Sequence, residues 1–329
     1  MFLPHGFGMA LAMTVTSTLC WGSWANTYKL TRGYRFELFY WDYAIGIVLV
    51  SLIWALTLGT MSTGGSSGAG FLANVAGADG GNIVFALIGG LIFNIANLLL
   101  VAAIEMAGLA IAFPLAIGIA LVVGVILSYA IDPRGNPLVL ACGVALAIVA
   151  VVFDGKAYGA LKAGSSVSRR SVIVCVVSGL LMGSFAPFVT RALTSGHALG
   201  PYSIAVFFTL GALLSCFVVN IHFMKRPLVG APVDFSGFAS ARPADHLLGV
   251  LGGFVWGTGT VFNFVAASFV GVAISYAIGQ AAPMVAAVCG VAVWHEFRGA
   301  PSRAWMYLVL MFAAYIAALA VLASAYGAA

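Results

Sequence analysis

Neutral polar side chains stand inside long apolar stretches of this 329-residue chain, where polar groups are costly and therefore point to function. Asn, Gln, Ser and Thr side chains exchange hydrogen bonds with hydroxyl, amide and carbonyl groups without carrying charge. That chemistry suits a neutral ligand with several polar groups. The alternative is that these side chains only join helices to one another, at ~0.6 kcal/mol per hydrogen bond. The candidates are Asn26, Asn94, Asn97, Ser184, Thr260, Asn263 and Gln280.

Two pairs among these residues have helical spacing. Asn94 and Asn97 lie three residues apart, as do Thr260 and Asn263, so each pair occupies one face of a helix. We expect the two polar faces to meet in the middle of the molecule.

Aromatic side chains could supply flat surfaces for the apolar face of a sugar or for a planar ring derived from a purine. The interfacial aromatic belt is a competing explanation for Trp24, which lies about 7 Å along a helix from Lys29. Trp21 lies deeper and is the better candidate. The aromatic candidates for solute binding are Trp21, Trp24, Phe113, Trp256 and Tyr276. Ordinary packing between helices is the alternative explanation for each of them.

Proton coupling would require an acid within the apolar stretches, and Asp42 and Glu105 are the two candidates. Asp42 could instead have a structural role at a helix start, and Glu105 falls at a turn that water can reach. Glu296 and Arg298 are expected to form a structural ion pair. We expect no metal site and no cofactor, and the five cysteines show no paired spacing that would indicate a disulfide framework.

The elements that position these residues must be membrane-spanning helices. Hydrophobic residues make up 63% of the chain and charged residues only 7%, against roughly 25% charged in soluble domains. A spanning helix needs ~20 apolar residues. We therefore predict an all-α protein with ten spans, at residues 7–28, 40–60, 83–104, 108–131, 136–153, 171–192, 200–222, 247–268, 271–293 and 303–326.

Basic residues gather in the joints on one side of the predicted spans. Twelve of the fourteen lysines and arginines follow odd-numbered spans, and only Arg134 and Arg191 fall on the other side. Because basic loops remain cytoplasmic, both termini are expected outside the cytoplasm, in a bacterial-type inner membrane. The joint at 154–170 is then cytoplasmic.

The sequence also contains an internal repeat. Two segments of the first half recur in the second half at a separation near 162 residues. The first is Gly22-Ser23-Trp24-Ala25-Asn26, which recurs as Gly183-Ser184-Phe185-Ala186-Pro187. The second is Gly89-Gly90 with Gly108, which recurs as Gly252-Gly253 with Gly271. Five spans in each half would reverse the orientation of the second half, as in the inverted repeats of secondary transporters. We predict one repeat at 1–153, a cytoplasmic connecting loop at 154–170 and an inverted repeat at 171–329.

These segments resemble the ureide permeases and the bacterial sugar transporters of the glucose/ribose and rhamnose type, within the drug/metabolite transporter superfamily. The similar motifs cover nearly the whole chain and are Gly22-Ser23-Trp24, Trp41-Asp42-Tyr43, Asn97-Leu98 to Gly108-Leu109, Phe207-Phe208, Gly252-Gly253-Phe254 and His295-Glu296-Phe297-Arg298. The resemblance implies a ten-helix importer of small neutral solutes, commonly coupled to protons. Plant ureide permeases carry a long central loop, which is short here.

Together these observations predict a secondary active transporter, a proton-coupled importer of a small neutral polar solute that works by alternating access. A sugar is the first choice, and purine-derived ureides or nucleobases are the alternative. An efflux pump for drugs or metabolites is a further alternative. Export of cationic drugs would need an acidic residue deep in the membrane to hold the cation. We expect no enzymatic activity, no nucleic-acid partner, contact with membrane lipid, and a monomer or homodimer.

Overall fold

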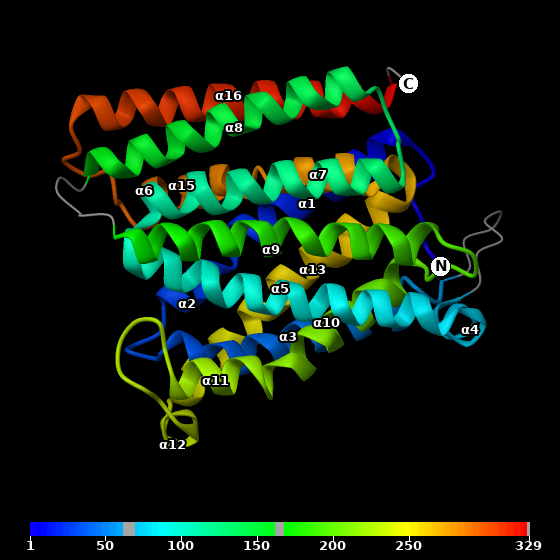
Figure 1. The fold of residues 1–329 in the computed structure, drawn as a ribbon, viewed down its shortest axis with the longest axis horizontal. Helices are drawn as coiled ribbons and strands as arrows, with labels where there is room; N and C mark the ends of the chain where they lie inside the picture. The colour runs from blue at the N-terminus through cyan, green and yellow to red at the C-terminus, as the bar shows by residue number, and fades with distance from the viewer. Residues whose placement is uncertain (62–69, 162–167, 328–329) are drawn as a thin grey trace.

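The computed structural model describes residues 1–61, 70–161 and 168–327, and every regular element in these ranges is a helix. Long helices run side by side along the longest axis of the molecule (Figure 1). Nine of the described helices are long and apolar enough to cross a membrane. The chain is therefore a multi-pass membrane protein, as its composition predicts.

Most helices match the predicted spans to within a few residues, and six are continuous. They are α3 (Phe36–Leu56), α5 (Gly80–Ala107), α8 (Pro137–Leu161), α9 (Arg169–Thr194), α13 (Pro243–Val270) and α16 (Ser302–Gly327). Three other spans consist of shorter pieces. These are α6 (Leu109–Ala112), η1 (Phe113–Ile117) and α7 (Gly118–Ile131), then α10 (Pro201–Cys216) with α11 (Val219–Lys225), and α14 (Val272–Gly279) with α15 (Ala282–Ala292).

The first predicted span is divided into α1 (Phe7–Ser23) and α2 (Ala25–Lys29). Trp24 between them keeps helical dihedral angles and donates its backbone N–H to Cys20, so the chain does not unwind there. Because α1 has only 17 residues, it is not among the nine spanning helices, and a tenth span stays a prediction. Two further short helices, α4 (Phe71–Gly77) and α12 (Phe235–Ala239), lie between spans.

The predicted connecting loop at 154–170 begins too early, because α8 continues to Leu161. The charged residues Asp154 and Lys156 mark the end of the apolar stretch in the sequence. Asp154 is instead fully buried, while the Lys156 Nζ atom lies 5.7 Å from the ring centroids of Phe153 and Tyr307. Residues 162–167 of the predicted loop lie outside the described part of the chain.

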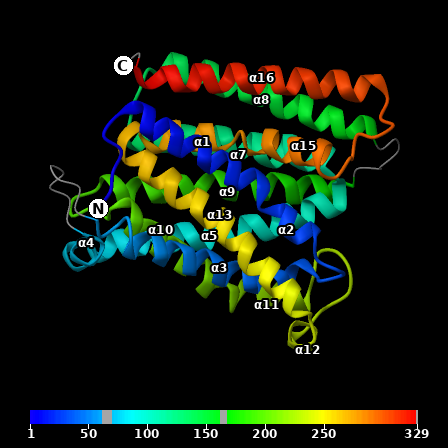
Figure 2. The ribbon, with the colours of Figure 1, turned by 180° about the vertical axis from the view of Figure 1, so that it is seen from behind.

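The principal helix contacts join the first part of the chain to the second. α1 packs on α13 and α9 packs on α5; α3 packs on α13 and α10 packs on α5; α8 packs on α16. Figure 2 shows α13 crossing between α1 and α3. The third helix of each predicted half thus contacts the first and second helices of the other.

Glycines bring α5 and α10 together. A Cβ added at Gly90 would overlap the carbonyl oxygen of Phe208, and one added at Gly211 would overlap the carbonyl oxygen of Leu87. Only residues without a side chain allow two helix backbones to approach this closely.

The same arrangement recurs between α3 and α13. A Cβ at Gly253 would overlap the carbonyl oxygen of Tyr43, and one at Gly46 would overlap the carbonyl oxygen of Val250. We call these four residues, Gly46, Gly90, Gly211 and Gly253, the crossing glycines.

The two ends of the bundle differ in what they carry. The N- and C-termini lie at one end, and α2, α11 and α12 lie at the opposite end (Figure 1). That opposite end also carries basic residues: Lys29 at the end of α2, Lys225 at the end of α11, and Arg242 just before α13. These three basic residues therefore lie at the end of the molecule that does not carry the termini.

Candidate functional site

Three stacked aromatic rings lie where α1, α5 and α13 meet. The Trp256 ring is stacked on Trp21 at a centroid distance of 5.9 Å and on Phe93 at 4.4 Å, with interplanar angles of 17° and 24°. We call Trp21, Trp256 and Phe93 the central stack. Phe93 was not among our candidates. Its position 163 residues before Trp256 is the repeat separation, and this signal could have identified it.

Hydrogen-bonding groups line one edge of the central stack. Trp21 Nε1 donates to Thr260 Oγ1 at 3.1 Å, and the Thr260 hydroxyl donates to the Trp256 carbonyl at 3.1 Å. The Asn263 amide donates to the Ser275 carbonyl at 3.0 Å. An added Cβ at Gly279 would lie 2.6 Å from the Trp21 ring and 3.1 Å from the Asn263 amide, so the end of α14 lies against this edge.

Gln280 and Tyr276 complete this side of the site. Gln280 directly follows Gly279 and is buried. The Tyr276 hydroxyl donates to the carbonyls of Ala120 at 3.3 Å and Met182 at 3.2 Å, which ties α14 to α7 and α9. Phe113 begins the π-helical turn η1, and its side chain lies outside what the structure describes.

Asn94 and Asn97 form a separate buried cluster. Asn94 Nδ2 donates to Ser215 Oγ at 2.6 Å, and its Oδ1 has no partner among the described residues. The Asn97 amide faces the Tyr40 hydroxyl but forms no hydrogen bond with it.

The two predicted polar faces therefore do not meet through hydrogen bonds in the described ranges. Phe93 and Trp256 meet in their place. The physical reason is that Asn97 faces the α3 side of α5, whereas Thr260 faces α1 from α13.

Three other candidates form local contacts. The Ser184 hydroxyl donates to the Leu180 carbonyl on its own helix at 2.6 Å. Asn26 donates to the Ser23 carbonyl at 2.7 Å and accepts from Trp294 Nε1 at 2.6 Å, which satisfies both ends of its amide. The Trp24 ring lies 4.9 Å from that of Tyr43. None of these contacts involves the central stack.

Asp42 is part of a cluster of three polar side chains, Asp42, His246 and Tyr34, which we call the Asp42 cluster. His246 Nδ1 lies 2.8 Å from Asp42 Oδ2 and 3.0 Å from Oδ1, and the Tyr34 hydroxyl donates to Oδ2 at 2.9 Å. Asp42 is buried, whereas the His246 side chain is 27% exposed. Burial and the hydrogen bond to Asp42 raise the pKa of Tyr34, so it remains a donor.

Sequence reasoning missed His246 and Tyr34. His246 stands in the first turn of α13, 204 residues from Asp42, and the chain offers no local signal for that pairing. The absence of a side chain at Gly249 lets α13 lie directly against the Asp42 side chain.

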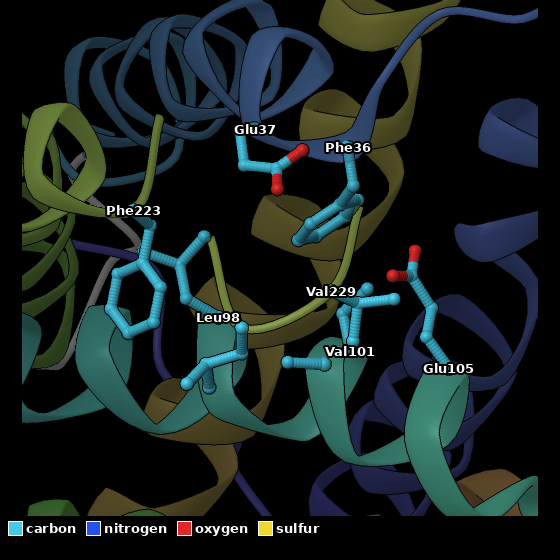
Figure 3. A pocket seen from close by; sticks show the side chains of 9 residues that line it. Phe36, Glu37, Leu98, Val101, Glu105, Phe223 and Val229 are labelled. Atoms are coloured by element: carbon cyan, nitrogen blue, oxygen red, sulfur yellow. The ribbon is translucent and has the colours of Figure 1, made fainter. Parts of the chain in front are cut away.

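Glu105, the other acid candidate, lines a pocket of about 20 Å³ near the end of α5. Figure 3 shows the carboxylates of Glu37 and Glu105 projecting into this pocket near Phe36 and Val229. Arg35 holds Glu37 through two hydrogen bonds, of 2.6 and 3.1 Å. Glu105 is exposed near the end of α5, and its role in proton coupling stays a prediction.

The expected Glu296–Arg298 ion pair is replaced by one between Glu296 and Lys29. Tyr158 also donates to Glu296, at 3.3 Å, and the Lys29 ammonium lies 4.6 Å from the Trp294 ring centroid. The fold brings α2 and α8 to the segment before α16, and residues close in sequence carry no signal of these contacts. These contacts join three elements at the basic end of the bundle.

Comparisons with known proteins add to this geometry. A family model described as ureide permease matches residues 39–166 and 171–325. Ureide permeases 1 and 2 of Arabidopsis thaliana are 25% and 23% identical to this chain, over 392 and 397 aligned residues, with 99% of each chain covered. A solved structure described only as the crystal structure of a protein shares the fold, with a TM-score of 0.61 at 17% identity over 95% of this chain and 96% of that chain.

The matches confirm one part of the resemblance seen in the sequence. The wider superfamily and the similarity to sugar transporters stay predictions. The family model accounts for most of the chain on both sides of the joint near residue 170. The chain therefore belongs to the ureide permease family.

Proposed function

We propose that this protein is a secondary transporter that imports a ureide, a neutral solute rich in amide groups, across a cell membrane. The observation that carries the proposal is the match to the ureide permease model over both halves of a multi-pass membrane protein. The comparisons favour the ureide alternative over the sugar that we placed first. A transporter, not an enzyme, is the activity that the family suggests.

The central stack and its polar edge are the proposed solute site. A ureide is planar in part and offers several N–H and C=O groups, which suit aromatic faces beside Thr260, Asn263 and Gln280. Trp256 is only 7% exposed, so the conformation seen is closed at this point. Solute access requires Trp256 and Phe93 to separate, and these residues belong to different halves. Separation of the halves would give alternating access.

The inverted repeat draws support from the helix bounds. α5 spans 80–107 and α13 spans 243–270, so both have 28 residues at a separation of 163. Each ends at a glycine with positive φ, Gly108 at 75° and Gly271 at 87°, a conformation that L-residues rarely adopt. The reciprocal contacts of the crossing glycines fit the same relation. We therefore retain two five-helix halves, with the first extended to Leu161.

The charge distribution supports an orientation. Basic joints gather at the end of the bundle that lacks the termini, and such joints remain in the cytoplasm. We place both termini outside, in an inner or plasma membrane.

The Asp42 cluster is the proposed site of proton coupling. A carboxyl group that is buried beside a partly exposed imidazole can bind and release a proton as its surroundings change. Asp42 follows the start of α3, and α3 packs directly on α13, which carries Trp256. A change in the charge of the cluster therefore acts on a helix of the solute site.

A matched pair of threonines tests the solute site. Thr260→Val removes the hydroxyl at the central stack and leaves Trp21 Nε1 without its acceptor. Thr258 lies on the same helix, α13, and accepts an equivalent 3.1 Å bond from Trp54 Nε1 of α3, away from the stack; Thr258→Val removes that bond. The Thr260 hydroxyl belongs to the proposed solute site, and a hydrogen bond from it to the solute is worth ~0.5–1.5 kcal/mol. We therefore expect solute affinity to fall about tenfold in Thr260→Val. Affinity should stay unchanged in Thr258→Val, whose hydroxyl lies outside the site.

Ligand-dependent thermal stabilisation of the purified protein measures this affinity, since a ligand stabilises by RT ln(1 + [L]/Kd). Ureides, sugars, nucleobases and lipophilic cations form the screen. Stabilisation by lipophilic cations alone would favour the efflux alternative. Equal loss of affinity in both threonine variants would remove the central stack from the solute site.

A further inference from the structure

Asp154 is a buried acid that the proposed solute and proton sites do not use. It lies inside the spanning helix α8 and has no exposed surface. Neither carboxyl oxygen has a hydrogen-bond partner within the ranges that the structure describes. An acid held in this way inside a membrane is costly and points to function.

The surroundings of Asp154 are apolar. It shares a face of α8 with Ala150, Val151 and Ala157, which belong to a cluster that also contains Leu308 and Met311 of α16. Tyr315 of α16 lies close to Asp154 and is also fully buried, and its hydroxyl has no partner among the described residues.

Charged and titratable groups around this cluster are engaged elsewhere. Lys156 lies over the Phe153 and Tyr307 rings, and Arg303 donates to the Tyr307 hydroxyl at 3.1 Å. The titratable groups near Asp154 are Tyr158 on its own helix and Tyr315 on α16. Cys289 of α15 and Glu296 lie near Tyr158, and the charge of Glu296 is paired with Lys29. The α6 and η1 segments contribute no titratable side chain.

A carboxylate without a counter-ion or hydrogen-bond donors is strongly disfavoured in an apolar interior, whereas the neutral acid is tolerated. From the burial, the two unpartnered oxygens and the apolar cluster, we propose that Asp154 is a second proton-binding site, neutral in the closed conformation, whose ionisation loosens α8 from its neighbours. This gating role rests on the proposed transport function; the proton site itself does not.

The route from Asp154 to the solute site passes through Tyr158. Tyr158 lies one helical turn from Asp154 and donates to Glu296, which is paired with Lys29 of α2. An ionised Asp154 would compete for the Tyr158 hydroxyl and so weaken the contact of α8 with Glu296. α2 follows α1, which carries Trp21. Loss of the proton is therefore expected to favour opening of the central stack.

Infrared spectroscopy of the full-length protein in lipid nanodiscs tests the proton site directly. At neutral pH, we expect the wild type to show the carbonyl stretching band of a protonated carboxylic acid and Asp154→Asn to lack it. Asp79→Asn is the matched control, because Asp79 is an exposed acid that caps α5, and it should retain the band. Identical bands in wild type and Asp154→Asn would overturn the proposal. Should Asp154→Asn not fold, Asp154→Glu should shift the band in frequency, and an unshifted band would likewise overturn it.

Solute exchange across proteoliposomes, without a proton gradient, tests the gating role. Wild-type exchange should quicken as pH rises and Asp154 ionises, whereas Asp154→Asn should bind the ureide, exchange it slowly and lose this pH dependence. Wild-type-like exchange with unchanged pH dependence in Asp154→Asn would overturn the gating role. A wild type that binds no ureide would instead refute the proposed function, and the infrared band would still decide the proton site.

Discussion

Asp42→Asn is expected to abolish accumulation of the solute against its gradient while solute exchange continues. Asparagine has nearly the shape of aspartate and can still accept the Tyr34 hydrogen bond. It cannot take up a proton or pair with a charged His246. A transporter without its proton site loses the free energy of the proton gradient but keeps its solute site. Uptake by proteoliposomes under an imposed pH gradient measures the accumulation, and counterflow measures exchange.

The control for Asp42→Asn is Asp245→Asn. Asp245 stands beside His246 in the first turn of α13, but Arg242 neutralises it through bonds of 2.6 and 2.8 Å. We expect this variant to accumulate solute like the wild type. Wild-type accumulation by Asp42→Asn would remove the Asp42 cluster from the coupling mechanism. Loss of both accumulation and exchange would show that Asp42 only supports the fold.

Alanine at the crossing glycines is expected to destabilise the protein strongly. In Gly90→Ala and Gly253→Ala, the new methyl group would overlap a backbone oxygen of the facing helix, and a backbone cannot turn away as a side chain can. Overpacking costs typically 1–3 kcal/mol, and we expect at least ~3 kcal/mol here because two helices must move apart. Thermal unfolding in detergent measures the loss.

Gly118→Ala is the matched control for these variants. Gly118 is also in a helix, yet an added Cβ meets no atom within 4 Å among the side chains and backbone that the structure describes. Since alanine favours helix by ~1 kcal/mol over glycine, this variant should be as stable as the wild type or more so. Gly90→Ala with wild-type stability would contradict the close crossing of α5 and α10. Similar losses in Gly90→Ala and Gly253→Ala would agree with the reciprocal arrangement of the two crossings.

The positions of most spans could be predicted because they depend on local composition. Apolar stretches located the helices, and Gly108 and Gly271 located the turns after α5 and α13. The end of α8 could not be found in this way. Charged residues such as Asp154 and Lys156 usually mark the end of a span. Only the packing of α16 on α8 shows that Asp154 is buried.

The candidate site was predicted in part. Trp21, Trp256 and Thr260 were chosen for their residue types, and the fold brings them together. Phe93 and His246 were missed. Each acts through a partner more than 160 residues away, and single-sequence patterns describe neighbours along one helix. Solute binding by these residues stays a prediction.

The crossing glycines have a consequence for how such a chain could have arisen. In a symmetric dimer, residue i of one subunit meets residue j of the other, and j meets i. Gly46 and Gly253, with Gly90 and Gly211, follow this rule within a single polypeptide. Neither predicted half keeps its main helix contacts without the other. Under the proposed inverted repeat, a half-length ancestor would therefore be expected to be stable only as an antiparallel homodimer whose two copies enter the bilayer in opposite orientations.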